Sequence, residues 1–177
     1  MHDTCVLSSE KDEISWNGTR LLTGQTRASP MFKNILVPTD GSAPSRKAIK
    51  RAVQLAREQK ARITGFYVGP AWRLPVQAEF VPVEVLSPKE HDIAVKKAGN
   101  RILGAVKNAA AAARVRCRCS YVMSDHPYAE IVKAAKRNRC DLIVIASHGR
   151  RGISKLLLGS ETSKVLAHST VPVLVCR

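Results

Sequence analysis

The chain alternates short apolar runs with longer segments in which apolar residues recur every three or four positions. Apolar runs of this length predict strands, and a three-to-four-residue period predicts helices with one buried face. The predicted strands are residues 32–37, 61–68, 115–122, 142–146 and 171–176. The predicted helices are one that begins at Ser42, then 88–113, 128–138 and 160–168.

This order of elements predicts the fold class. Strands that alternate with helices are typical of a parallel sheet, because each crossover helix packs on one face of the sheet. We therefore predict an α/β protein with an open five-stranded parallel sheet and helices on both faces, similar to Rossmann folds. In such sheets a ligand lies beyond the carboxyl ends of the strands, where the winding direction reverses.

Two strand ends carry residues suited to a ligand. The apolar run 142–146 stops at Ser147-His148-Gly149, a basic glycine-containing loop follows, and a helix begins near Ser160, the predicted N-cap. Glycine lets backbone N–H groups approach a ligand, and a helix N-terminus favours phosphate. The first strand ends at Pro38-Thr39-Asp40-Gly41. If the two strands are neighbours, Asp40 faces the glycine loop across the crevice.

The first 30 residues have no apolar period and no charged segment followed by an apolar core, so they do not resemble a signal peptide. Met31 is followed by Phe32-Lys33-Asn34 and resembles a natural protein start. We expect residues 1–30 to be a disordered tail or an over-extended start, and residues 31–177 to form the domain.

Charge favours an anionic partner. The net charge is +15, and residues 31–177 hold 26 of the Lys and Arg against 10 of the Asp and Glu. Arg114, Arg116 and Arg118 alternate along a predicted strand, which leaves nucleic-acid binding open as an alternative. Charged residues also protect the edge strand of a sheet from pairing, and no nucleic-acid module or aromatic platform accompanies them. No apolar run is long enough for a membrane span, and we expect a cytoplasmic protein.

The five cysteines have no disulfide-framework spacing. Cys117 and Cys119 fall on one face of a predicted strand, and Cys140 precedes another strand. No His stands at a ligand spacing from them, which disfavours a zinc site and favours reduced thiols.

Two segments resemble the universal stress protein family. Ile35-Leu-Val-Pro-Thr-Asp-Gly-Ser42 resembles its opening strand, and Ser147-His-Gly149, nine residues, Gly159-Ser160 and Val171-Pro-Val-Leu-Val175 resemble its C-terminal half. The resemblance covers residues 31–177. It implies a five-stranded parallel sheet, a cytoplasmic homodimer and, in one branch, ATP bound between the first and fourth strands.

In that ATP-binding branch the motif is Gly-x-x-Gly, nine residues, then Gly followed by Ser or Thr. This chain matches it except that Ala146 replaces the first glycine, which is tolerable in an extended backbone and serious at positive φ. The resemblance implies nucleoside contacts from Asp40 and from the backbone of Val68, and phosphate contacts from four further residues. The full predicted set is Pro38, Thr39, Asp40, Val68, Ala146, His148, Gly149, Gly159, Ser160, Glu161 and Thr162. Glu161 would repel phosphates unless Mg²⁺ or Arg150 intervenes, and we expect ATP to bind with Mg²⁺.

The expected function is a nucleotide-binding stress-response module. The alternative is a dimeric stress protein that binds no nucleotide and acts through protein partners. An enzyme is disfavoured: Ser147 half-resembles a nucleophile elbow, but Ile145 stands where the elbow needs glycine and no helix follows at once. We predict a homodimer through the C-terminal strand Val171–Cys176, because an apolar edge strand invites pairing and would bury Val173 and Val175.

Overall fold

A computed structural model describes residues 14–16, 19–21, 30–73, 87–149 and 158–177. Its centre is a parallel five-stranded sheet with the strand order β5-β4-β3-β6-β7. The strands are β3 (Asn34–Pro38), β4 (Arg62–Gly69), β5 (Cys117–Met123), β6 (Leu142–Ala146) and β7 (Val173–Cys176). The predicted fold class is confirmed.

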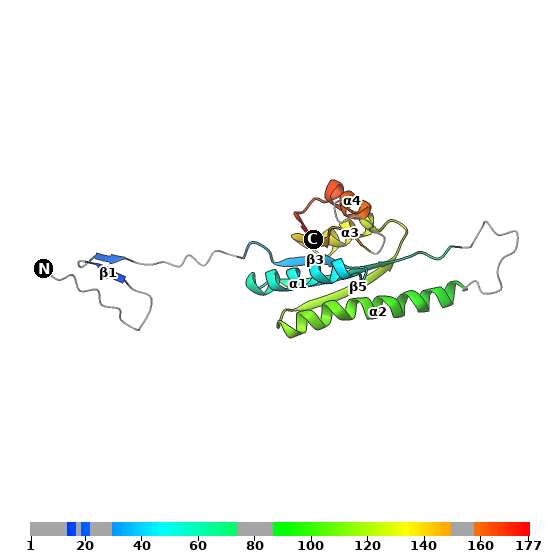
Figure 1. Cartoon of the computed structure of the whole chain (residues 1–177), viewed down its shortest axis with the longest axis horizontal. Coiled ribbons are helices and arrows are strands. Elements are labelled where there is room, and N and C mark those ends of the chain that lie inside the picture. Colours follow the sequence, from blue (N-terminus) through cyan, green and yellow to red (C-terminus); the bar gives the residue numbers. More distant parts are fainter. Residues whose placement is uncertain (1–13, 17–18, 22–29, 74–86, 150–157) are drawn as a thin grey trace.

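Four helices cover the two faces of this sheet, two on each side (Figure 1). They are α1 (Ala43–Glu58), α2 (Pro88–Ala112), α3 (Pro127–Arg137) and α4 (Ser160–His168). One core cluster joins α1 and α2 to the sheet, and a second joins α3 and α4 to the opposite face. Successive residues of β3 serve different clusters, because strand side chains alternate between faces. Ile35 and Val37 belong to the first cluster and Leu36 to the second.

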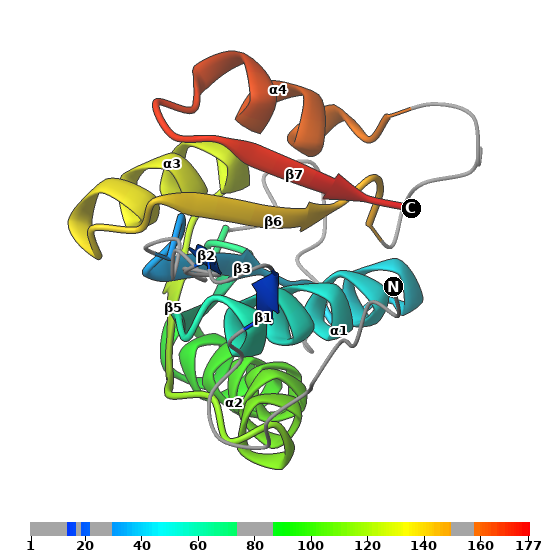
Figure 2. The same cartoon turned by 90° about the vertical axis from the view of Figure 1, so that its left-hand side faces the viewer.

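The order of the strands creates the crevice that the sequence predicts. From central β3 the chain winds outward to β4 and β5, and then returns to the other side of β3 for β6 and β7. The winding direction therefore reverses between β3 and β6, which pair through Ile35 with Leu142 and Leu36 with Ile143. Figure 2 shows β3, β6 and β7 following one another across the sheet.

Local capping explains where two helices begin. The Ser42 hydroxyl accepts a hydrogen bond from the Ser45 backbone N–H at 3.3 Å, which confirms Ser42 as the predicted N-cap of α1. Ser87 and Glu90 form a reciprocal capping box at the start of α2, with Pro88 in the first turn. Such boxes satisfy two N–H groups that a helix start leaves without partners.

Most predicted boundaries differ from the observed ones by one or two residues. In α3 the buried residues are Ile131, Ala134 and Ala135, and Val132 is only partly buried.

The described parts of the first 30 residues contain a short antiparallel pair, β1 (Ile14–Trp16) and β2 (Thr19–Leu21). The sequence does not predict this pair, because strands of three residues are too short to show an apolar period. These strands form a sheet of their own (Figure 1). That residues 1–30 are dispensable for the domain stays a prediction.

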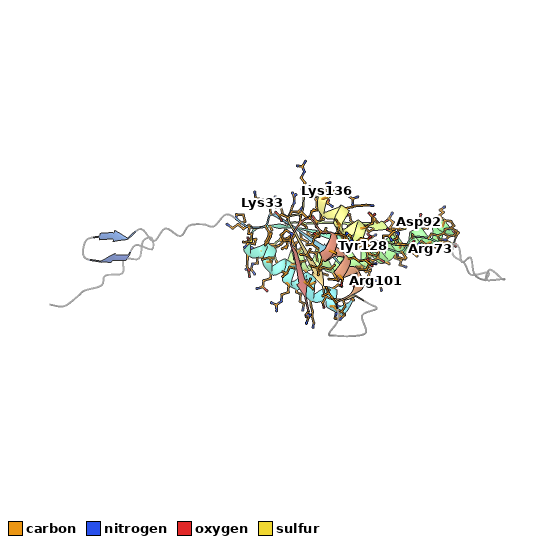
Figure 3. All side chains as sticks on the ribbon, turned by 90° about the horizontal axis from the view of Figure 1, so that it is seen from above. Lys33, Arg73, Asp92, Arg101, Tyr128 and Lys136 are labelled. Carbon is orange, nitrogen blue, oxygen red and sulfur yellow. The ribbon has the colours of Figure 1, made fainter. Side chains whose placement is uncertain are left out.

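The surface carries the excess of basic side chains, among them Lys33, Arg101 and Lys136 (Figure 3). Strand β5 lies at one edge of the sheet. Arg118 on this strand and Arg116 just before it are exposed, as expected of charged residues that keep an edge strand from pairing with another chain. Within the described residues, no helix combines the length and apolar character that a membrane crossing needs.

Candidate functional site

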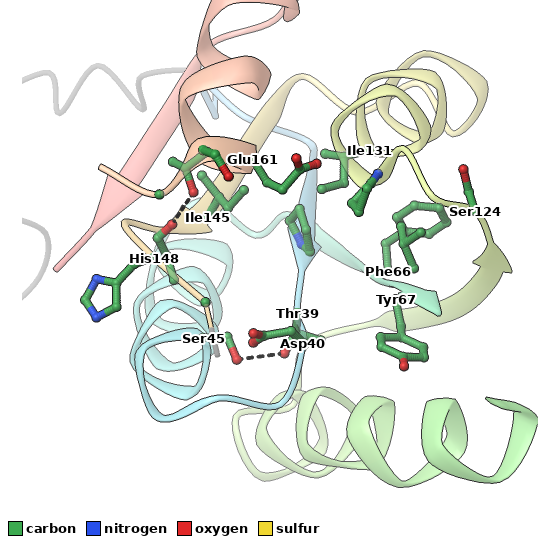
Figure 4. A pocket seen from close by; sticks show the side chains of 18 of the residues that line it. Thr39, Asp40, Ser45, Phe66, Tyr67, Ser124, Ile131, Ile145, His148 and Glu161 are labelled. Carbon is green, nitrogen blue, oxygen red and sulfur yellow. Dashed lines mark hydrogen bonds between the residues drawn. The ribbon is translucent and has the colours of Figure 1, made fainter. Parts of the chain in front are cut away.

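A cleft of about 650 Å³ opens at the carboxyl ends of β3, β4 and β6. Its volume falls in the ordinary range of small-molecule sites. The structure brings together in its lining every residue that the sequence predicts for the site (Figure 4). These residues are Pro38, Thr39, Asp40, Val68, Ala146, His148, Gly149, Gly159, Ser160, Glu161 and Thr162.

The end of β3 is held in place by a small hydrogen-bond network. The Thr39 hydroxyl donates to Ser45 Oγ at 3.1 Å and accepts from the Gly41 N–H at 3.2 Å. Gly41 has a φ of 80°, a conformation that favours glycine and turns the chain into α1. The Asp40 carboxylate accepts from the Ser42 N–H at 2.9 Å. Asp40 therefore has a fixed position at the mouth of the cleft.

The end of β6 settles whether Ala146 is tolerated. Ala146 is the last residue of β6 and pairs with Cys176, so its backbone is extended. Its carbonyl accepts a hydrogen bond from the buried Thr162 hydroxyl at 2.9 Å. Because an extended backbone suits any residue, the replaced motif glycine strains nothing here.

Other parts of the chain come close to the backbone at Gly149 and at Gly159. A Cβ on Gly149 would lie 2.7 Å from Asp40 Oδ2, which places the glycine loop directly against the β3 carboxylate. A Cβ on Gly159 would lie 3.1 Å from His148 Cα and 3.2 Å from the Ser147 carbonyl. The Gly159 N–H donates to that same carbonyl at 2.7 Å. A side chain at position 159 would push these backbone segments apart, and one at position 149 would displace the Asp40 carboxylate.

The N-terminus of α4 faces the cleft, with one correction to the prediction. Gly159, not Ser160, is the N-cap, and no side chain caps the helix. Ser160 is the first helical residue, because Gly159 still has the extended backbone of an N-cap (φ −62°, ψ 144°). The first-turn N–H groups of an α-helix have no partner within the helix, so those of Ser160, Glu161 and Thr162 are suited to bind an anion.

Glu161 has structural partners that the sequence does not reveal. Its Oε2 accepts from the Tyr128 N–H, in the first turn of α3, at 2.8 Å. Its Oε1 lies 3.2 Å from Lys164 Nζ. The carboxylate thus caps one helix and is paired with a cation, which reduces the repulsion expected between Glu161 and a phosphate.

The other side of the cleft is apolar. Phe66, Ile131 and Tyr67 lie on the side away from His148, and a further apolar lining residue, Ile145, lies between His148 and Glu161 (Figure 4). The Phe66 carbonyl accepts from the Thr39 N–H at 2.9 Å, and β3 ends there. Since backbone groups of alternate strand residues point to the same side, those of Val68 face the space beyond β3. This geometry suits recognition of a planar base by the Val68 backbone.

His148 and Ser147 do not form a nucleophile elbow. The His148 Nδ1 lies 3.0 Å from Ser147 Oγ, but Ser147 is buried and is not among the cleft residues. Among the described residues, the next helix after β6 begins at Ser160, whereas an elbow needs a helix directly after the nucleophile. This contact instead orders the turn after β6.

The charged side chains that line the cleft are negative. The described lining residues include Asp40, Asp125 and Glu161 and contain no Lys or Arg. Arg73 makes an ion pair with Asp125 at 2.7 Å near the rim. Arg150 and Arg151, the predicted basic tip of the loop, lie outside the described residues.

Several residues that line the cleft were not predicted from the sequence. Ser45, Tyr67, Ser124 and Asp125 also line the cleft. Ser124 and Asp125 directly follow β5, so the rule that ligands lie at carboxyl strand ends could have found them. Ser45 and Tyr67 lie within a helix and a strand, and the sequence carries no signal that they reach the cleft.

This fold and cleft define a doubly wound α/β protein with a cleft at the switch point of its sheet. The sequence profile of the universal stress protein family matches residues 31–177. Universal stress protein YxiE of Bacillus subtilis is 38% identical over 151 residues, 83% of this chain and all of the relative. The chain belongs to the universal stress protein family.

Solved structures agree with this assignment. MJ0577 of Methanocaldococcus jannaschii superimposes with a TM-score of 0.67 at 27% identity, over 82% of this chain and 96% of that one. A universal stress protein in complex with cAMP has a TM-score of 0.57 at 25% identity, over 81% and 95% of the two chains.

Proposed function

We propose that this protein is a stress-response module that binds ATP, with Mg²⁺, in the cleft between Asp40 and the N-terminus of α4. It signals through conformation or partners and not by turnover. The observation that carries the proposal is the contact between the two halves of the site: Gly149 lies against the Asp40 carboxylate, and the start of α4 borders the same cleft.

The nucleoside would occupy the apolar side of the cleft. The base packs near Ile131 and Ile145 and bonds to the backbone of Val68, while Asp40 accepts from the ribose hydroxyls. The fold neighbour solved with cAMP supports an adenine nucleotide as the ligand class. Its 25% identity to this chain leaves the choice among adenine nucleotides to experiment.

The phosphates would lie against the N-terminus of α4, with N–H donors from its first turn and hydroxyls from Ser160. Helix N-termini carry partial positive charge that favours phosphate. Mg²⁺ is usually held by substrate phosphates together with one or two carboxylates. Glu161, at the start of α4, would be the carboxylate to share Mg²⁺ with the phosphates, and the described residues form no group of three or more metal-binding side chains.

The protein would act as a homodimer through β7. The strand lies at a sheet edge, and Leu174 on it is 43% exposed. Val173 and Val175 are partly buried against the core that α3 and α4 form with the sheet, so a dimer would cover only what remains exposed of them. Leu174 and the free strand edge are left for the partner copy. A cytoplasmic location, implied by the family resemblance, stays a prediction.

Thermal unfolding with a set of ligands tests the ligand class. ATP, ADP, AMP, cAMP and adenosine are compared at equal concentration with and without Mg²⁺, and GTP is the control for base selectivity. A ligand that binds only the folded state raises Tm. We expect the largest rise with Mg-ATP and none with GTP. A flat response to all of them would favour the alternative, a dimeric stress protein that binds no nucleotide.

A further inference from the structure

Two cysteines on strand β5 lie close together on the face covered by α2. Cys117 and Cys119 are two residues apart in the strand, and their Sγ atoms are 3.7 Å apart. Both pack against the core cluster that α1 and α2 form with the sheet, and both are partly accessible to solvent. The pair is remote from the cleft lining and has no part in the proposed nucleotide site.

The neighbouring strand makes room for this pair. Cys119 pairs with Gly65 of β4, and a Cβ on Gly65 would lie 2.8 Å from Cys119 Sγ. Cys119 Sγ also contacts the Leu103 carbonyl of α2 at 4.0 Å. Cys119 Sγ therefore lies among Gly65, Leu103 and Cys117, with the Cys117 sulfur 3.7 Å away.

The two thiols have different acidities. The hydrogen bond with Cys119 lowers the pKa of Cys117 to about 7, and the ammonium of Lys107 acts in the same direction. The same hydrogen bond, together with burial, raises the pKa of Cys119. Burial raises the pKa of Cys140 and of Cys176. Among the described cysteines, Cys117 is thus the one with pronounced thiolate character at neutral pH.

We propose that Cys117 and Cys119 form a peroxide-oxidisable dithiol that closes an intramolecular disulfide. In the first step the Cys117 thiolate attacks one oxygen of hydrogen peroxide, the O–O bond breaks, and hydroxide leaves. This yields a sulfenic acid on Cys117. In the second step the Cys119 sulfur, losing its proton, attacks the Cys117 sulfur, and the sulfenic oxygen leaves as water. Two thiols are oxidised and one peroxide is reduced to two waters.

Forming this bond requires a local rearrangement of β5. Residues two apart in a strand have Cα atoms about 6.6 Å apart, near the upper end of the range that disulfides span, and a disulfide also brings the two Cβ atoms to about 3.5–4.5 Å. The sulfur atoms must approach from 3.7 Å to a bonded distance, so β5 must leave its extended conformation around Arg118. As an edge strand, β5 pairs with β4 alone in the five-stranded sheet and can bend more easily than a central strand.

Peptide mapping tests the proposal directly. The full chain is treated with hydrogen peroxide, its remaining thiols are blocked with N-ethylmaleimide, and it is digested with trypsin. Trypsin cleaves after Arg116 and Arg118, so the reduced protein releases Cys117-Arg118 as a separate dipeptide. We expect peroxide to leave that dipeptide tethered to the peptide beginning at Cys119, and reduction to release it. Cys140 should remain free for alkylation.

Rates of alkylation and two variants supply the controls. Cys117, whose pKa is lowered and whose thiol is partly accessible, should react with iodoacetamide faster than Cys140, which is buried and whose pKa burial raises. In Cys119→Ser the sulfenic acid should persist and be trapped by dimedone, and Cys117→Ser should form neither product. A freely released Cys117-Arg118 after peroxide treatment, or dimedone labelling absent from Cys119→Ser, would overturn the proposal.

Discussion

The Glu161 carboxylate accepts a hydrogen bond from the Tyr128 N–H at 2.8 Å and so joins the starts of α4 and α3. The two residues are 33 positions apart in the chain. This contact fixes the spacing of two helix N-termini at the edge of the cleft. It also gives Glu161, which the sequence predicts to oppose phosphate binding, a structural role.

Replacing Glu161 by Ala should lower the free energy of unfolding by about 1 kcal/mol, because the Tyr128 N–H loses the acceptor that caps α3. Glu161→Gln keeps an acceptor and should retain most of the stability. Urea unfolding at one fixed protein concentration measures both. Lys164→Met is the control for the Glu161–Lys164 ion pair, which is exposed and worth less. Equal losses in Glu161→Ala and Lys164→Met would contradict the capping role.

Gly159→Ala should destabilise the protein and weaken nucleotide binding more than tenfold. Its Cβ would crowd backbone atoms of Ser147 and His148, which cannot rotate away, so the start of α4 must move. Gly104→Ala in α2 is the matched control, since its Cβ meets nothing within 4 Å. That change should stabilise the helix by about 0.5–1 kcal/mol. Chemical unfolding and calorimetry compare the two, and similar effects from both would contradict the close-approach argument.

Ala146→Gly restores the first glycine of the ATP motif. Because Ala146 is the last residue of an extended strand, we expect nucleotide affinity to change by no more than about twofold and stability to fall by about 0.5–1 kcal/mol. Equilibrium titration with ATP measures the affinity. A tenfold gain would show that the alanine methyl obstructs the site.

The sequence was sufficient for the fold, which depends on local patterns, and local patterns together with the family resemblance identified part of the cleft lining. Apolar runs identified the strands, and the residues after Val37 and Ala146 lie at carboxyl strand ends, which meet at one edge of a parallel sheet. The link between Glu161 and Tyr128 could not be predicted, because it depends on how α3 and α4 pack on one face. The N-cap at Gly159 was missed for a similar reason: only the tertiary contact with His148 excludes a side chain there.

Leu174→Lys should convert the proposed dimer to monomers by placing a charge on the exposed side of β7. Leu166 on α4 provides a matched control, since both leucines are 43% exposed and only Leu174 lies on the edge strand. Sedimentation velocity at tens of micromolar measures the assembly state. A monomeric wild-type protein, or equal effects from Leu174→Lys and Leu166→Lys, would contradict an interface through β7.

Calorimetric titration of Mg-ATP into the wild-type protein, Asp40→Ala and Gly149→Val tests the central claim. Asp92→Ala, which changes an exposed carboxylate on α2, is the control for loss of charge. We predict saturable binding to the wild type and to Asp92→Ala, weaker binding to Asp40→Ala, and none to Gly149→Val, whose side chain would crowd the Asp40 carboxylate. No heat and no thermal shift at millimolar Mg-ATP, or equal binding by all four proteins, would contradict a nucleotide site in this cleft.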